Sequence, residues 1–172
     1  PNREELRAKG ASDETLSKLF DFAFVGFMQD SREIGHNNRI DYLDALFKAF
    51  PNSWLTTGAF FEDMAIRYVR ARVGFNISIA NDLNMRVFEV MSFGVPLLTN
   101  DDVDGMDELV GDWVHFIGYK GISAMGVMAN GVIRNWGDGG LEKVALNAFN
   151  EVRSKHTYKH RMEKMVEDLK NV

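Results

Sequence analysis

The chain has 172 residues, a length that fits one domain with a sizeable hydrophobic core. Its formal net charge of −5 argues against a nucleic-acid partner, and because no apolar run approaches about 18 residues we expect neither a membrane span nor a signal peptide. The sequence contains no cysteine, which excludes disulfides and thiolate metal sites and fits the cytoplasmic location that we expect.

Strands and helices are expected to alternate along the whole chain. In chain order the pattern predicts a helical lead-in over 1–20, strand 22–26, helix 39–50, strand 54–58, helix 62–72, strand 73–79, helix 85–93, strand 95–99, strand 113–119, helix 122–136 and C-terminal helices over 141–172. Such alternation is typical of a doubly wound parallel sheet. Residues 1–172 are therefore predicted to form a single Rossmann-like domain of the α/β class.

The loop after the first expected strand is a candidate phosphate contact. Gly26 ends that strand, and a long polar loop over 27–38 follows, in which Arg32 is a candidate substrate-binding residue. Long loops in compact domains are often functional. As a phosphate signal the glycine is weak, because no G-x-G-x-x-G or G-K-[ST] pattern follows it.

The stretch 72–100 predicts a strand, a loop, a short helix and a second strand. Apolar residues partly alternate through 73–79, and Gly94 with Pro96 marks the helix end, because glycine takes the left-handed cap and proline cannot continue a helix. Two strands joined by one helix are expected to lie parallel. A loop and helix that follow the carboxyl end of such a strand lie where open α/β sheets bind ligands.

Arg86 and Glu89 are the only charged residues of the helix over 85–93, and they lie three positions apart on one face. The free N–H groups and the positive dipole end at the helix start suit a phosphate. An ionised Glu89 one turn further on needs hydrogen-bond donors, which the two hydroxyls of a ribose would supply. The alternative is an ordinary i,i+3 ion pair with no ligand.

Two other patterns resemble metal sites. The segment NDDVDG begins like a calcium loop at Asn100, but the twelfth position is Gly111 instead of a bidentate Glu, so we interpret 100–111 as an acidic loop that caps a helix. His156 and His160 are four residues apart, but no carboxylate motif accompanies them, and a solvated C-terminal helix explains them better. We therefore expect no metal site.

Four sequence segments between Phe22 and Leu169 carry a family resemblance. They are FAFVGF followed by Arg39-Ile40-x-Tyr42-Leu43-x-Ala45-Leu46, then Tyr68-x-x-Ala71-Arg72-Val73-Gly74-Phe75-Asn76, then Asn84-Met85-Arg86-Val87-Phe88-Glu89-Val90-Met91-x-x-Gly94, and finally His156-Thr157-Tyr158-x-x-Arg161. Together they resemble the C-terminal half of GT-B-fold glycosyltransferases of the group-1 kind, especially the spore-maturation-type branch. The third segment is the most specific of the four.

The resemblance implies a domain that binds a nucleoside-diphosphate sugar, needs no other cofactor and no metal, and faces an N-terminal acceptor domain that this chain lacks. The helix-start amides of Asn84, Met85 and Arg86 would hold the diphosphate, and Arg86 would neutralise its charge. Gly26 would let the first loop approach the phosphates closely.

Many such enzymes carry two glutamates spaced E-x7-E, of which the second binds ribose. Glu89 matches the second position, whereas Asn81 stands at the first, where it is a candidate substrate contact. Arg86 and Glu89 are the candidate catalytic residues, because a positive site stabilises the leaving nucleotide diphosphate without a protein nucleophile. We expect this donor-binding half to be inactive alone. The alternative, favoured by Asn81, is a non-catalytic Rossmann-like binding or assembly module.

Overall fold

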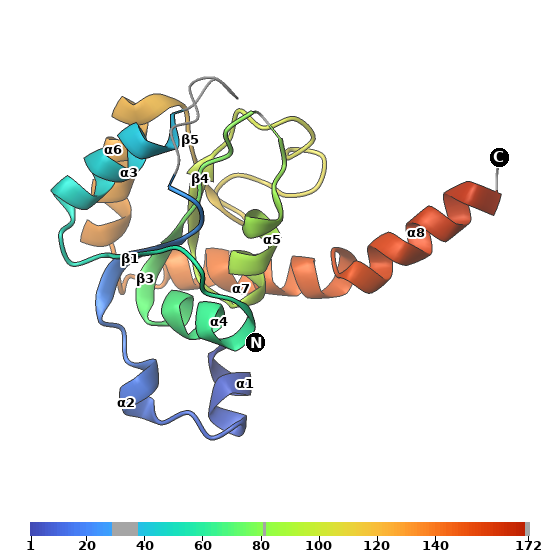
Figure 1. Ribbon diagram of the computed structural model, residues 1–172, viewed down its shortest axis with the longest axis horizontal. Coiled ribbons are helices and arrows are strands. Elements are labelled where there is room, and N and C mark those ends of the chain that lie inside the picture. Colours follow the sequence, from blue (N-terminus) through green and yellow to red (C-terminus); the bar gives the residue numbers. More distant parts are fainter. Residues whose placement is uncertain (29–37, 81, 171–172) are drawn as a thin grey trace.

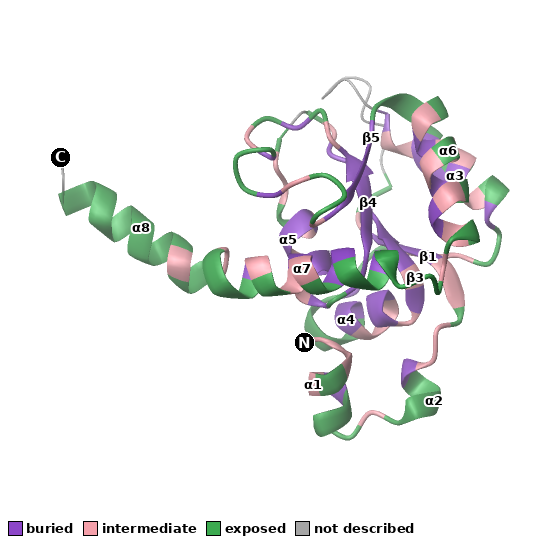
Figure 2. Ribbon diagram, turned by 180° about the vertical axis from the view of Figure 1, so that it is seen from behind, coloured by how far each residue is buried: buried purple, intermediate pink, exposed green. Residues whose placement is uncertain are grey.

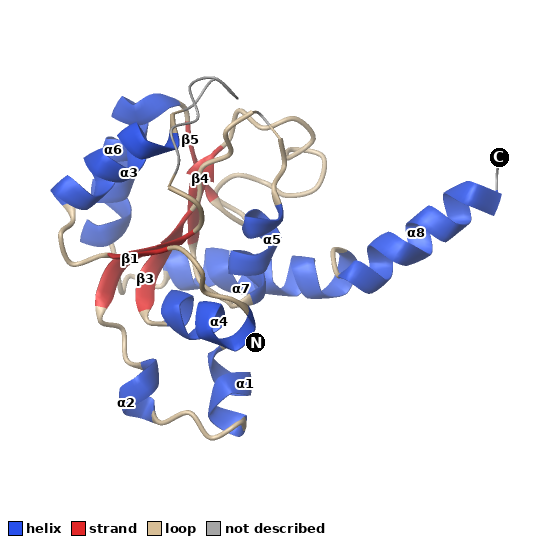
Figure 3. Ribbon diagram, in the orientation of Figure 1, coloured by secondary structure: helices blue, strands red, loops and turns tan. Residues whose placement is uncertain are grey.

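A five-stranded parallel sheet forms the centre of the protein (Figure 3). The computed structural model describes residues 1–28, 38–80 and 82–170. The strands are β1 (Phe20–Val25), β2 (Trp54–Thr56), β3 (Ala71–Phe75), β4 (Leu97–Asn100) and β5 (Ile117–Tyr119). Their order across the sheet is β2-β1-β3-β4-β5, and every neighbouring pair is parallel.

Helices cover both faces of the sheet (Figure 1). They are α1 (Arg3–Ala8), α2 (Asp13–Leu16), α3 (Arg39–Ala49), α4 (Phe61–Val69), α5 (Met85–Ser92), α6 (Gly121–Arg134), α7 (Gly140–Lys155) and α8 (Tyr158–Lys170). Helices α3 and α6 lie over one face, and α4, α5 and most of α7 lie over the other. The predicted α/β class with a parallel, Rossmann-like sheet is confirmed.

The strands are apolar on both faces because both faces are covered. In β1, Phe22 and Phe24 pack against α3 and α6, whereas the intervening Ala23 and Val25 pack against the helices of the opposite face. Successive side chains of a strand point to opposite faces. Near-continuous apolar strands are therefore what a sheet between two helical layers requires.

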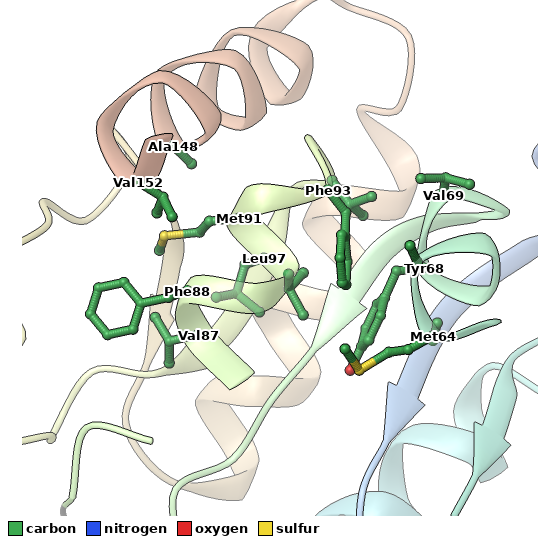
Figure 4. Close-up of a cluster of buried hydrophobic side chains, with 14 of the residues drawn as sticks. Met64, Tyr68, Val69, Val87, Phe88, Met91, Phe93, Leu97, Ala148 and Val152 are labelled. Atoms are coloured by element: carbon green, nitrogen blue, oxygen red, sulfur yellow. The ribbon is translucent and has the colours of Figure 1, made fainter. Parts of the chain in front are cut away.

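Helix α5 packs closely against β3. A Cβ atom at Gly74 would lie only 2.5 Å from Cγ1 of Val90, so glycine is needed for this approach. Figure 4 shows the apolar cluster around the helix, in which Met91 and Phe93 lie between side chains of α4 and α7. Gly94 ends the helix with φ +69, the left-handed conformation that the Gly-x-Pro pattern predicts.

Helix α8 extends away from the rest of the molecule (Figures 1 and 2). Its residues are exposed or half-buried, and none is buried. Across the described ranges, no helix combines the length and the apolar character that a membrane crossing needs.

Several boundary predictions need correction. The strands expected over 54–58 and 73–79 end at Thr56 and Phe75. The helix expected over 62–72 ends at Val69, because Ala71 already pairs with Phe20 of β1. The strand expected over 113–119 is shortened to Ile117–Tyr119, since Trp113 has φ +54 and stands in a turn instead of a ladder. The acidic segment over 100–111 caps no helix. It forms turns, and the chain next enters β5.

Candidate functional site

A buried polar network joins the carboxyl ends of β3 and β4. Asn76 donates from Nδ2 to Oγ1 of Thr99 at 3.0 Å, and the Ser78 amide donates to Oδ1 of Asn100 at 2.8 Å. Asn76, Ser78, Thr99 and Asn100 are each at most 2 % exposed. Tyr119 completes the network by donating its hydroxyl hydrogen to the Asn76 carbonyl at 3.0 Å, and burial holds the pKa of this phenol well above its usual value.

Asn84 attaches helix α5 to this network. Its Oδ1 accepts the Arg86 amide at 3.1 Å as an N-cap, and its Nδ2 donates to Oγ of Ser78 at 2.9 Å and to Oδ1 of Asn76 at 3.4 Å. The Asn84 side chain therefore positions the helix start. This cap occupies the Arg86 amide, which is one of the three amides predicted to hold a diphosphate, and the Val87 amide lies 3.3 Å from the Asn84 carbonyl. A phosphate at this helix start would therefore meet fewer free amides than the sequence implies.

Arg86 and Glu89 form an ion pair, with 2.9 Å between Nη1 and Oε2. The Arg86 guanidinium also contacts Sδ of Met64 on α4. The two side chains are 24 % and 33 % exposed, so both remain accessible from solution. The ion pair that the sequence offers as an alternative to a ligand contact is thus present. It leaves Oε1 of Glu89 as a further acceptor.

The pair lies in a groove of about 590 Å³, here called the α4–α5 groove. It extends from Arg86 to the end of α5 and the N-terminus, and it is lined by Pro1, Lys9, Ala59, Phe60, Phe61, Glu62, Met64, Arg86, Glu89 and Phe93. Phe60 and Phe61 are 70 % and 87 % exposed, and Phe61 has φ +50, a conformation that bulky residues rarely adopt. Neither aromatic residue is among the site residues predicted from the sequence. Two adjacent phenylalanines between a strand end and a helix start are the signal that points to them.

Arg39 forms a second cationic element at the same edge of the sheet. Its Nη1 donates to the Phe27 carbonyl at 3.0 Å and its Nη2 to the Ile77 carbonyl at 3.2 Å, so it joins the chain segments that follow β1 and β3. Burial lowers the pKa of Arg39, and the nearby Arg86 charge lowers it further. Arg39 was not predicted as a site residue, because its partners are distant in the sequence.

Glu89 also borders a smaller cavity on the other side of α5. This cavity has a volume of about 240 Å³ and reaches α7 and the start of α8. Met85 lies here, 48 % exposed, and accepts a hydrogen bond from the Tyr158 hydroxyl to its Sδ at 3.3 Å. Arg161 stacks over the Phe88 ring at 4.6 Å. The Met85 side chain thus takes part in α5–α8 packing, whereas Arg86 lies in the α4–α5 groove.

Three predicted site residues remain, namely Gly26, Arg32 and Asn81. Gly26 follows β1 and donates its amide to the Thr56 carbonyl at 3.1 Å, and a Cβ there would lie 2.8 Å from the Phe24 ring. A larger residue at this position would require the Phe24 ring to shift. Arg32 and Asn81 lie outside the described residues.

The histidines named in the sequence have separate partners. Nε2 of His156 lies 3.6 Å from Oε1 of Glu151, and Nδ1 of His160 lies 2.8 Å from Oγ1 of Thr157. Burial lowers the pKa of His156. In the part of the chain that the structure describes, no group of three or more His, Asp or Glu residues is arranged to hold a metal ion.

The strand order creates a switch point beside the start of α5, where Arg86 borders the α4–α5 groove. From β1 the chain passes to β2 on one side and later to β3 on the other, so the direction of strand addition reverses between β1 and β3. Open α/β sheets bind ligands outside the carboxyl ends of the strands at such a switch point.

A family model described as "Glycosyl transferase-like" matches residues 46–167. The chain belongs to this glycosyl transferase-like family.

Solved glycosyltransferase structures share the fold of this family member. The pneumococcal O-GlcNAc transferase GtfA, solved with UDP and GlcNAc, aligns with a TM-score of 0.62 and 14 % identity over 90 % of this chain and 36 % of its own. Anabaena Alr3699/HepE, solved with UDP-glucose, aligns with a TM-score of 0.64 and 13 % identity over 94 % of this chain and 54 % of its own. The C-terminal domain of the group 1 glycosyltransferase LpcC from Francisella tularensis aligns with a TM-score of 0.54 and 10 % identity over 92 % of this chain and 94 % of its own.

The extent of these alignments defines which part of a glycosyltransferase the chain resembles. The chain spans 36 % of GtfA and 54 % of HepE, but 94 % of the isolated LpcC C-terminal domain. No curated protein matches the sequence. The predicted resemblance to the C-terminal domain of a GT-B glycosyltransferase is confirmed at this level, and the spore-maturation branch stays a prediction.

Proposed function

We propose that this domain binds a nucleoside-diphosphate sugar in the α4–α5 groove and serves as the donor-binding half of a glycosyltransferase. The observation that carries the proposal is the Arg86–Glu89 pair, which lies partly exposed in a groove beside the β1–β3 switch point. A purely structural ion pair needs no adjoining cavity. The ligands of GtfA and HepE, UDP with GlcNAc and UDP-glucose, are of the proposed class.

Each group in the groove has a chemical role toward such a ligand. Glu89 accepts the ribose hydroxyls through the oxygen that Arg86 does not use, and Arg86 turns its guanidinium toward the diphosphate. The half-buried Arg39 adds positive potential at the same edge. The exposed faces of Phe60 and Phe61 offer apolar surface to a nucleobase.

The proposed chemistry is electrostatic. As the glycosidic bond breaks, negative charge develops on the leaving diphosphate, and Arg86 stabilises it in place. No protein nucleophile is required. The acceptor comes from a domain outside this chain in the proposed enzyme, so we expect nucleotide binding but no sugar transfer from the 172-residue chain alone.

The first test is a thermal-shift panel of nucleotides and nucleotide sugars, with UDP and UDP-glucose included, each measured with Mg²⁺ and with a chelator. Ligand at about 100 times its Kd should stabilise the domain by roughly 2.7 kcal/mol. We expect the same shift with and without metal, because helix dipole and arginine already supply positive charge. A shift that requires the metal would contradict this site. A scaffold that serves only as an assembly module would respond to no nucleotide.

A further inference from the structure

A second groove lies at the opposite edge of the sheet. The turn that precedes β5, the last turns of α6 and the start of α7 line a cavity of about 510 Å³, here called the Trp113 groove. Because this turn stands immediately before the first residue of β5, the groove belongs to the amino edge, away from the α4–α5 groove. Its volume is within the range of small-molecule sites.

Trp113 is held in a strained and exposed position at this groove. Its φ is +54 and it is 53 % exposed, although a bulky aromatic residue would ordinarily be buried with negative φ. Its amide donates to Oδ1 of Asp112 at 2.9 Å and to the Phe116 carbonyl at 2.7 Å. Oδ1 of Asp112 also accepts the Gly118 amide at 2.7 Å. The turn thus fixes the indole outward at a cost in conformational strain.

The rest of the groove combines an apolar floor with polar groups. Val132, Leu141 and Val144 are buried beneath it. Around them stand Asn135, Asp138, Lys143 and Asn147. Asp138 accepts the Gly140 amide at 2.8 Å through Oδ1, and within the described residues the side chains of Asn135, Lys143 and Asn147 form no hydrogen bond or ion pair. Two amides and an ammonium group are therefore available to a ligand.

We propose that the Trp113 groove binds a neutral saccharide. A pyranose presents an apolar C–H face, which suits the flat indole, and a rim of hydroxyls that both donate and accept, which suits the Asn135 and Asn147 amides. One carboxylate and one ammonium give the rim no net charge, which does not favour a phosphorylated ligand. This inference goes beyond the proposed nucleotide site and does not depend on it.

Two glycines of α6 provide a matched pair of variants. A Cβ atom at either Gly126 or Gly131 would meet nothing within 4 Å, so a larger side chain is tolerated at both positions and should raise helix stability. Only Gly131 lines the groove. Gly131→Leu should fill the groove, and Gly126→Leu is its control. Trp113→Gly is a third variant, which relieves the positive φ and removes the indole.

The probes are maltotriose, cellotriose and chitotriose, and the readout is the indole N–H signal of Trp113 among three tryptophans in a ¹H–¹⁵N NMR spectrum. We expect at least one probe to shift this signal at up to about 10 mM. Gly131→Leu should weaken that binding on the order of tenfold or more, with Gly126→Leu unchanged. Trp113→Gly lacks the reporter indole, so its binding is followed through the backbone amide signals of the same spectrum, and binding should be abolished. Nucleotide binding should persist in all three variants.

Two results would overturn the saccharide site. One is that no probe shifts the Trp113 signal at these concentrations, and the other is that both glycine variants bind the probe equally well. Because nucleotide binding is measured separately on the same samples, failure of the saccharide site is distinguishable from failure of the nucleotide site.

Discussion

The two ends of strand β4 have opposite chemistry. Leu97 and Leu98 at its amino end lie in apolar clusters on the two faces of the sheet, whereas Thr99 and Asn100 at its carboxyl end join a hydrogen-bonded network. All four are buried to a similar degree. Among the described residues, the buried polar side chains other than tyrosine are Asn38, Asn76, Ser78, Thr99 and Asn100, which lie at strand carboxyl ends or in the segments that follow them.

This difference shows which part of the sheet is specialised. Burial of a polar side chain costs free energy unless its hydrogen bonds are satisfied, so apolar residues would serve stability at least as well at these positions. The network instead fixes Asn84 and thereby the start of α5. Stability is distributed over the apolar body, while the carboxyl edge is organised to position Arg86 and Glu89.

The largest stability loss is expected from the apolar end of β4. Leu97→Ala leaves a cavity beside α5, because Leu97 is fully buried in the cluster of Figure 4. Urea unfolding should show a loss of about 2–5 kcal/mol. Nucleotide affinity, measured well below the melting temperature, should stay unchanged. A large loss of affinity in the folded variant would mean that the apolar body also shapes the site.

Asn76→Leu should cost about 1–3 kcal/mol, because it leaves the Thr99 hydroxyl buried without its partner. The double variant Asn76→Leu with Thr99→Val removes both partners and should recover part of that loss. Urea unfolding of the two single variants and the double variant measures the coupling. If the losses simply add, Asn76 and Thr99 are not energetically coupled.

Asn84→Ala should cost about 0.5–2 kcal/mol through loss of the N-cap of α5. Ser12→Ala is the control, since Ser12 caps α2 by accepting the Thr15 amide at 3.1 Å. Both variants should lower the melting temperature, but only Asn84→Ala should weaken nucleotide binding, because α5 carries Arg86 and Glu89 of the proposed site and α2 carries none of it. Equal nucleotide affinity in the two variants would remove Asn84 from the positioning role.

Much of the fold follows from local sequence patterns. Each of the five expected strands is present, although those expected over 73–79 and 113–119 are shorter, and the Gly94–Pro96 helix end is predicted correctly, because its cause lies within a few residues. The same holds for the Arg86–Glu89 contact, which follows from i,i+3 spacing on a helix. The sequence could not decide between an ion pair and a ribose contact. The two roles are compatible in the structure, since the pair uses one carboxylate oxygen.

Features that depend on long-range register were not predicted. Asn76 and Thr99 are 23 residues apart and meet only because β3 and β4 align in parallel. Arg39 reaches Ile77 across 38 residues because β1, which precedes it, pairs in parallel with β3. The apolar pattern of 113–119 suggests a strand, but Trp113 adopts a left-handed conformation, which its amide supports by donating to Oδ1 of Asp112 and to the Phe116 carbonyl.

Substitution of Glu89 should have the smallest effect on stability. The pair is partly exposed, so Glu89→Gln should change the free energy of unfolding by about 0–1 kcal/mol. Glu62→Gln is the matched control, because Glu62 lines the same groove and pairs with Lys9 instead. Both variants should remain folded, which allows their nucleotide affinities to be compared directly.

Calorimetric titration of these two variants and the wild type with a nucleoside diphosphate tests the ribose contact most directly. If Glu89 accepts the ribose hydroxyls, Glu89→Gln should lose on the order of 1.5–3 kcal/mol of binding, or about ten- to a hundredfold in Kd, with Glu62→Gln unchanged. The 2′,3′-dideoxy nucleotide should bind the wild type weakly and show little further loss in Glu89→Gln. Equal affinity of the wild type and Glu89→Gln for the same ribonucleotide would contradict the ribose contact and leave only the ion pair.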